Sequence, residues 1–217
     1  MLRIRKGRPP RILATLRRTP GITWEGVPGD AKAALREALL EEQGFLCAYC
    51  MRRVEAGFDN AGHPYTHVEH WSPRSGGADP LAWKDLLAVC TGDLDGGPHC
   101  DRAKADRPLT LHPAHPRQDV ERAIAYQADG RITTNPAADA ATLNLNQVTL
   151  RRSRRAVHDA TVTRIASADA TQLRAWITHW ERLGRDGHRQ PYAGVALSLL
   201  RRRLQSLSDR TRRIHQR

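Results

Sequence analysis

Four cysteines constrain the fold of this chain more than any other feature. The 217-residue sequence contains only Cys47, Cys50, Cys90 and Cys100. Two residues separate Cys47 from Cys50, so both thiolates can reach one ion from a tight turn, and Cys90 and Cys100 can complete a tetrahedral site. Such a site lets a loop-rich region fold without a large local core. We therefore predict a structural zinc ion held by four sulfurs.

Two other interpretations of the cysteines stay open at this point. A redox-active C-x-x-C pair is typically preceded by a strand and followed by a helix, whereas here a predicted helix precedes the motif. Four unrelated buried thiols are the second alternative, and His99 is an alternative ligand to its neighbour Cys100. A zinc ion with four thiolate ligands has no open position for water, so hydrolytic chemistry would need another metal.

The composition is that of a globular protein with a polyanionic partner. Hydrophobic residues make up 40% of the chain, and the formal net charge is +12, mostly from arginine in residues 3–18, 151–155, 201–203 and 210–217. Neutralising phosphates releases condensed counterions, so nucleic acid is the expected partner, although the same charge could simply decorate a solvated surface. The sequence has no apolar run of membrane-spanning length and no signal-peptide pattern, so we expect a cytoplasmic protein with no membrane association.

Hydrophobic periodicity and turn residues predict the order of elements. We expect a basic, extended and partly ordered arm over residues 1–29, a core over 30–110, and a region over 111–217 with a hairpin and then helices. Asp129-Gly130 predicts a type I′ turn in that hairpin. Trp176 and Trp180 lie four residues apart and are interpreted as core packing. The predicted helices cover residues 30–42, 147–165, 169–183 and 192–207, with a short helix from residue 101, and the predicted strands cover 66–71 and 86–89.

The residues that can carry chemistry lie among the cysteines. Phosphodiester hydrolysis needs an activated water and charge neutralisation, which one divalent cation and one general base can supply. Glu69 and Asp101 offer carboxylates for the cation, and His70 offers an imidazole that titrates near neutral pH. Asp85 and Lys104 complete the candidates. These residues also have interpretations without a catalytic role, because an aspartate can cap a helix and a lysine is most often solvated.

These motifs together resemble the zinc-stabilised HNH endonucleases. The resemblance is greatest to the PtuB-like nucleases of Septu and retron-associated antiphage systems, and its specific part spans residues 47–104. Weaker matches outside that part are Leu143-Asn144-Leu145-Asn146 and Gln190-Pro191-Tyr192. The matching core segments are Cys47-Ala48-Tyr49-Cys50, Val68-Glu69-His70-Trp71-Ser72-Pro73-Arg74-Ser75, Trp83-Lys84-Asp85-Leu86-Leu87-Ala88-Val89-Cys90 and His99-Cys100-Asp101-Arg102-Ala103-Lys104.

The resemblance implies a role for each candidate. His70 would be the general base, Glu69 and Asp101 would bind Mg²⁺ or Mn²⁺, and Lys104 would support a phosphate or the turn after Cys100. Asp85 stands where the family has an asparagine that orients the base. Because an ionised aspartate accepts hydrogen bonds but does not donate them, a third carboxylate beside the cation is the alternative role for Asp85.

The expected protein is therefore an α+β HNH endonuclease. Its fold would be a ββα-metal, treble-clef-like core with structural zinc, followed by a β-hairpin and a mainly helical C-terminal region. DNA is the favoured substrate and RNA stays open, and the resemblance implies antiphage defence under the control of an ATPase of the PtuA type. Two alternatives are a non-catalytic zinc-ribbon module that binds nucleic acid or protein, and a toxin-like ribonuclease that cleaves transfer RNA.

Overall fold

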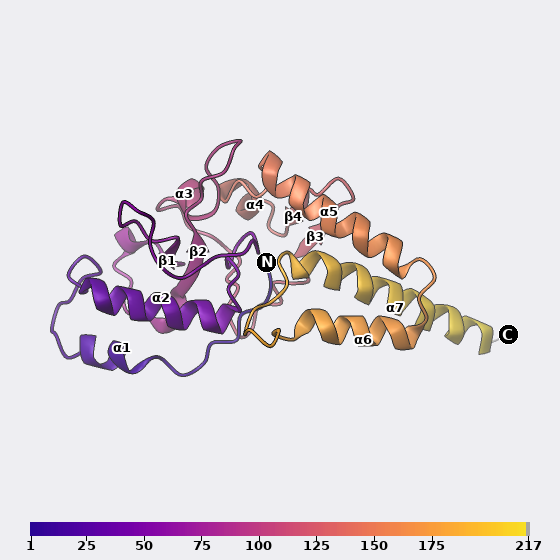
Figure 1. Cartoon of the computed structure of the whole chain (residues 1–217), viewed down its shortest axis with the longest axis horizontal. Coiled ribbons are helices and arrows are strands. Elements are labelled where there is room, and N and C mark those ends of the chain that lie inside the picture. The colour runs from indigo at the N-terminus through magenta and orange to yellow at the C-terminus, as the bar shows by residue number, and fades with distance from the viewer. Residues whose placement is uncertain (216–217) are drawn as a thin grey trace.

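The computed structural model describes residues 1–215 and has an α+β architecture (Figure 1). Two antiparallel two-stranded sheets lie among helices, and α5, α6 and α7 form the end of the molecule that carries the C-terminus. The elements are α1 (Arg11–Leu16), α2 (Gly29–Gln43), β1 (Thr66–His70), the 3₁₀ turns η1 (Arg74–Gly76) and η2 (Trp83–Asp85), β2 (Leu86–Cys90), α3 (Cys100–Lys104), β3 (Ile124–Tyr126), β4 (Ile132–Thr134), α4 (Ala138–Thr142), α5 (Val148–Ile165), α6 (Ala170–Glu181) and α7 (Ala193–His215).

The first sheet and the short helix after it occupy the middle of the cysteine-containing region. β1 pairs antiparallel with β2, from Thr66 opposite Cys90 to His70 opposite Leu86. Every residue of β2 is buried, which fits its uninterrupted apolar sequence. α3 follows and packs beside β2. The predicted strands and short helix are confirmed.

Helix α2 supports this sheet through a buried glutamine. The side-chain amide of Gln43 donates to the carbonyls of Leu46 and Ala88 and accepts from the Ala88 N–H, at 2.8 to 2.9 Å. Gly44 then ends the helix in the left-handed conformation (φ +62°), as expected for a glycine C-cap. The last turn of α2 is thus fixed to the centre of β2.

The N-terminal segment is not an extended arm, so that expectation is wrong. Residues 11–16 form α1, and Met1, Ile4 and Leu13 are buried in the core. Their apolar side chains outweigh the surrounding arginines, because burial of a large aliphatic side chain contributes about 1.5–3 kcal/mol. The Lys6 ammonium is also anchored, at 2.8 Å from Glu42 and 4.2 Å from the centre of the Trp83 ring.

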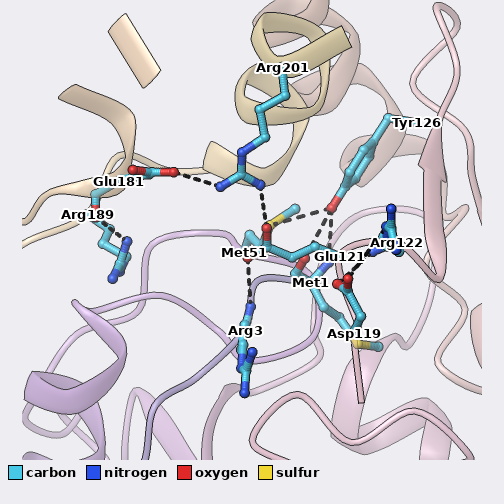
Figure 2. A network of polar contacts seen from close by, with 10 residues as sticks. All are labelled: Met1, Arg3, Met51, Asp119, Glu121, Arg122, Tyr126, Glu181, Arg189 and Arg201. Atoms are coloured by element: carbon cyan, nitrogen blue, oxygen red, sulfur yellow. Dashed lines mark hydrogen bonds and ion pairs between the residues drawn. The ribbon is translucent and has the colours of Figure 1, made fainter. Parts of the chain in front are cut away.

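A network of polar contacts joins this segment to the C-terminal half (Figure 2). Glu121 accepts from the Arg3 main-chain N–H at 3.2 Å and pairs with Arg201 of α7 at 2.5 Å. Arg201 also pairs with Glu181 of α6 at 2.8 Å, and Tyr126 of β3 contacts Met51, just after the first cysteine pair, at 3.8 Å. The N-terminal segment, the cysteine region and the C-terminal helices therefore meet at one place.

The hairpin β3–β4 is confirmed, but its turn is not type I′. Gly130 has a φ of +81°, whereas Asp129 is not among the residues with positive φ. The Gly130 N–H donates to Gln127 and the Gln127 N–H donates to Arg131, which is a type I turn followed by a left-handed glycine. A Cβ at position 130 would lie 2.0 Å from the Arg151 carbonyl oxygen. The glycine therefore lets α5 pack directly on the turn.

The three long C-terminal helices are confirmed within a residue or two at their N-terminal ends. Asp169 and Gln172 form a reciprocal capping box at the start of α6, and α7 packs against both α5 and α6. Trp176 and Trp180 pack against the core, as expected. Among residues 1–215, none of the helices has the length and apolar character needed to cross a bilayer.

Candidate functional site

The four cysteines form one buried cluster. Cys47 and Cys50 lie in the turn after α2, Cys90 ends β2, and Cys100 begins α3. Their sulfur atoms all lie within 4.8 Å of one another, and the Cys47–Cys100 and Cys50–Cys90 pairs are 3.8 Å apart. The sequence prediction that these four residues converge is confirmed.

The geometry and donor set of the cluster fit a zinc ion. Zinc–sulfur bonds of about 2.3 Å in a tetrahedron place neighbouring sulfurs about 3.8 Å apart, which is the spacing of the two closest pairs. Burial raises the pKa of the Cys50 and Cys100 thiols, so these sulfurs need a cation to be held as thiolates. His99 is fully buried, with Nε2 at 3.5 Å from Cys90 Sγ, and lies beside the cluster. The four cysteines could bind a structural metal such as zinc.

The cleft beside this cluster contains most of the other candidates. It has a volume of about 740 Å³, and Glu69, His70, Asp101 and Lys104 line it. Glu69 and His70 come from the end of β1, and Asp101 and Lys104 come from α3. The β1–β2 pairing and the docking of α3 therefore bring together four residues that were selected from sequence spacing.

His70 is held in one orientation by a main-chain carbonyl. Its Nε2 lies 3.0 Å from the Pro80 oxygen. A carbonyl only accepts, so Nε2 carries the proton and Nδ1 is left as the proton acceptor of the ring. Burial lowers the pKa of His70, although the hydrogen bond to Pro80 opposes this. The imidazole is therefore neutral near pH 7 and is suited to receive a proton.

Glu69 and Asp101 form a carboxyl pair. Burial, with a further contribution from Asp101, raises the pKa of Glu69 to about 8, while Lys104 opposes the rise. Burial also acts to raise the pKa of Asp101, but hydrogen bonds with His67 and Glu69 leave it below its ordinary value. Without a bound cation, the raised pKa favours the protonated form of Glu69 at neutral pH. Two neighbouring carboxylates require a proton or a cation between them.

The contacts of Glu69 are arranged on one of its oxygens. Tyr49 donates to Oε1 at 3.1 Å and the Lys104 ammonium lies 2.8 Å from the same atom. Lys104 is buried and also donates to the carbonyl oxygen of His70 at 3.3 Å. It is not a solvated surface lysine, and it positions both Glu69 and the main chain of His70.

Asp85 is the one candidate that is not brought to the cleft. Its Oδ1 lies 3.2 Å from Nε2 of His112. Nδ1 of His112 accepts from the Ala114 N–H at 3.0 Å, so Nε2 carries the proton and donates to Asp85. The main-chain oxygen of Asp85 accepts from the Trp71 N–H at 2.9 Å. Asp85 thus supports the end of the β1–β2 pair, because its main chain is bonded to Trp71, the residue that follows His70.

Sequence reasoning missed four groups around the cleft. Tyr49 was seen only as part of the cysteine turn, and the Pro80 carbonyl has no side-chain signature. His67 donates to Asp101 at 3.0 Å, and its position two residues before Glu69 on the same strand face could have indicated this. Trp24, from the N-terminal segment, packs edge-on against the His70 ring with centroids 4.8 Å apart. No local pattern could have placed Trp24 there.

No protein-family model matches the sequence, and no curated protein is significantly similar to it. The assignment of a function therefore depends on the residues and their geometry.

Proposed function

We propose that this protein is a metal-dependent endonuclease of the HNH type, which hydrolyses phosphodiester bonds of nucleic acid, with DNA as the expected substrate. The observation that carries the proposal is the convergence of one oriented imidazole and one carboxyl pair in a single cleft. The order β1, β2, α3, with a thiolate cluster at its base, is consistent with a ββα-metal core. The net charge of +12 supports a polyanionic substrate.

Each residue has a part in the proposed reaction. His70 Nδ1 takes a proton from the attacking water, while the Pro80 carbonyl keeps the opposite nitrogen protonated and the ring in place. Glu69 and Asp101 are hard oxygen donors of the kind that Mg²⁺ or Mn²⁺ prefers, so they would hold the cation. A divalent cation there would neutralise charge on the phosphate and stabilise the leaving oxygen.

The direct test is nicking of supercoiled plasmid by the purified chain with Mg²⁺ or Mn²⁺. We expect cleavage by the parent chain and its loss, by about a hundredfold or more, in His70→Ala and Glu69→Gln. His179→Ala, which changes an exposed histidine of α6, is the matched control and should keep full activity. Equal activity in the parent and His70→Ala chains would contradict the proposed endonuclease. Labelled transfer RNA, offered beside DNA, distinguishes the ribonuclease alternative by which substrate is cleaved.

Binding of the cation provides a second test that does not require turnover. Mn²⁺ titration followed by electron paramagnetic resonance should show one site, which is weakened in Glu69→Gln and Asp101→Asn but not in Glu37→Gln. A chain that binds nucleic acid and shows no such site would instead be the non-catalytic zinc-ribbon module.

The wider role rests on the sequence resemblance alone. From that resemblance we propose that the chain is the nuclease of an antiphage system and that an ATPase of the PtuA type controls it. Helices α5, α6 and α7 are the candidate surface on which the ATPase would dock. Co-purification with an ATPase encoded beside it tests the partner. Phage plating on cells that carry the pair, with and without His70→Ala, tests the defence role.

A further inference from the structure

One arginine and one glutamate face each other across the mouth of the cleft. Residues 22–25, between α1 and α2, form one wall, and η1, which begins at Arg74, forms another. The Arg74 guanidinium and the Glu25 carboxylate lie 2.5 Å apart. Their side chains are 55% and 71% exposed. The pair therefore bridges two segments of the cleft lining in a part of it that is open to solvent.

Both walls are fixed to the site below them. Trp24, next to Glu25, packs edge-on against His70 at 4.8 Å between ring centroids. On the opposite side, the Arg74 N–H donates to Asp106 Oδ1 at 3.1 Å, and Asp106 follows α3 directly. The main chain on each side is thus held next to the proposed reactive groups, while the two charged side chains are exposed to solvent.

The chemistry of Arg74 suits a phosphate as well as a carboxylate, and its present contact with Glu25 is through one N–O pair. A guanidinium presents paired N–H groups that match two phosphate oxygens. An ion pair as exposed as this one contributes little to stability, so its loss costs the fold little. Glu25, in contrast, places a negative charge in the lining of the cleft. Besides pairing with Arg74, its carboxylate accepts local hydrogen bonds from its own main-chain N–H and from the Thr23 hydroxyl.

We propose that Arg74 binds a phosphate of the nucleic-acid strand in the cleft, and that Glu25 holds the guanidinium until that phosphate displaces it. This inference rests on the proposed function, because it takes the cleft as the substrate site. Glu25 then competes with the phosphate for the Arg74 guanidinium, and so lowers the affinity of the chain for weakly bound polyanions.

The proposal is tested by measuring the affinity for a short fluorescein-labelled DNA duplex. Fluorescence anisotropy reports binding, at low ionic strength and without divalent cation. Glu25→Gln should tighten binding by about two- to fivefold, the weight of one exposed ion pair. Arg74→Gln should weaken it by about tenfold, as expected for loss of a charge-assisted contact. Glu37→Gln is the matched control, because it removes the same charge from an exposed position on α2 that does not line the cleft.

The double variant decides whether the two residues act together. If Glu25 acts by occupying Arg74, then Glu25→Gln in the Arg74→Gln background should gain no more than Glu37→Gln does. Equal effects of Glu25→Gln and Glu37→Gln in the parent chain would overturn the inference, as would full additivity in the double variant. Thermal unfolding midpoints of the variants should match the parent, because both side chains are exposed.

The binding assay separates failure of this inference from failure of the proposed function. If the chain cleaves DNA but Glu25→Gln binds no more tightly than Glu37→Gln, only the phosphate site is wrong. If the variants shift binding as expected but neither parent nor variant cleaves with Mg²⁺ or Mn²⁺, the nuclease assignment fails and the phosphate site stands. Absence of binding to duplex DNA, single-stranded DNA and RNA alike overturns the inference.

Discussion

Tyr49, which lies between the two cysteines of the first pair, donates a hydrogen bond of 3.1 Å to Oε1 of Glu69. This contact connects the turn that could bind structural metal to a carboxylate of the cleft. The Tyr49 side chain is fully buried, so its hydroxyl depends on Glu69 as a hydrogen-bond partner. The orientation of Glu69 therefore depends on the integrity of the cysteine turn.

We predict that Tyr49→Phe weakens binding of the catalytic cation while preserving the fold. The ring volume is kept, but the Glu69 carboxylate, which must be ionised to hold a cation, loses a donor worth about 1.5–3 kcal/mol. This corresponds to a tenfold or greater rise in the Mn²⁺ concentration for half-maximal cleavage. Tyr65→Phe, at an exposed tyrosine, is the control. An unchanged Mn²⁺ dependence in Tyr49→Phe would contradict the coupling.

We predict that the purified chain contains one zinc ion and depends on it for stability. The chain has a single cluster of four sulfurs and no further cysteines. Metal-bound cysteine sites contribute several kcal/mol to folding, so a strong chelator or Cys50→Ser should lower the thermal unfolding midpoint markedly. The zinc content is measured by atomic emission. A chain with no bound zinc, or one whose melting is indifferent to chelation, would exclude a structural zinc.

The free energy of unfolding should fall as the pH is lowered from neutral through about 6.5. Burial lowers the pKa of His112 below its ordinary value, although its partner Asp85 opposes this. The unfolded chain therefore binds a proton at a higher pH than the folded chain does, so acid favours unfolding. Stability is retained above the unfolded pKa and is lost below it.

Urea unfolding at a series of pH values measures this effect. The slope of stability against pH between 5 and 7 should be smaller in His112→Gln than in the parent chain. His179→Gln, at an exposed histidine, should leave the slope unchanged. Identical slopes in the parent and His112→Gln chains would show that His112 does not contribute.

Arg154→Ala should destabilise the protein by about 3 kcal/mol. The Arg154 side chain is almost completely buried, and it donates to the carbonyl oxygens of Gly130 and Leu145. Its removal leaves a cavity and two unsatisfied carbonyls between α5 and the hairpin. Arg155→Ala, which removes an exposed neighbour paired with Asp159, should cost less than about 1 kcal/mol. Chemical denaturation measures the free energy of unfolding of both variants. Equal losses in Arg154→Ala and Arg155→Ala would contradict the structural role given to Arg154.

The sequence predicted those parts of the structure that depend on local patterns. Apolar periodicity was sufficient for α2, and the spacing of the cysteines was sufficient for the cluster. Glu69, His70, Asp101 and Lys104 were identified because they follow or lie between those cysteines. The convergence of these four residues in a cleft follows from the β1–β2 pairing and the packing of α3 beside β2, and the apolar sequence of β2 favoured the strand.

The remainder depends on contacts between residues that are distant along the chain. Asp85 pairs with His112, 27 residues later, and nothing near either residue indicates the other. The segment that carries Trp24 and Glu25 was placed in an arm outside the core, because its arginine-rich surroundings concealed the few apolar residues that anchor it. The hairpin turn was assigned the wrong type because Asp-Gly is compatible with more than one loop length.

The positions of the sulfurs also have a consequence for how the protein is made. Cys47 and Cys100 are 53 residues apart, yet their sulfurs lie 3.8 Å from each other, and Glu69 and His70 lie between them in the chain. A nascent polypeptide that has not yet emerged past residue 100 has neither its last thiol nor Asp101 and Lys104. The cysteine cluster and the cleft beside it can therefore form only after residue 104 has left the ribosome, so the first half of the chain must be complete before the site exists.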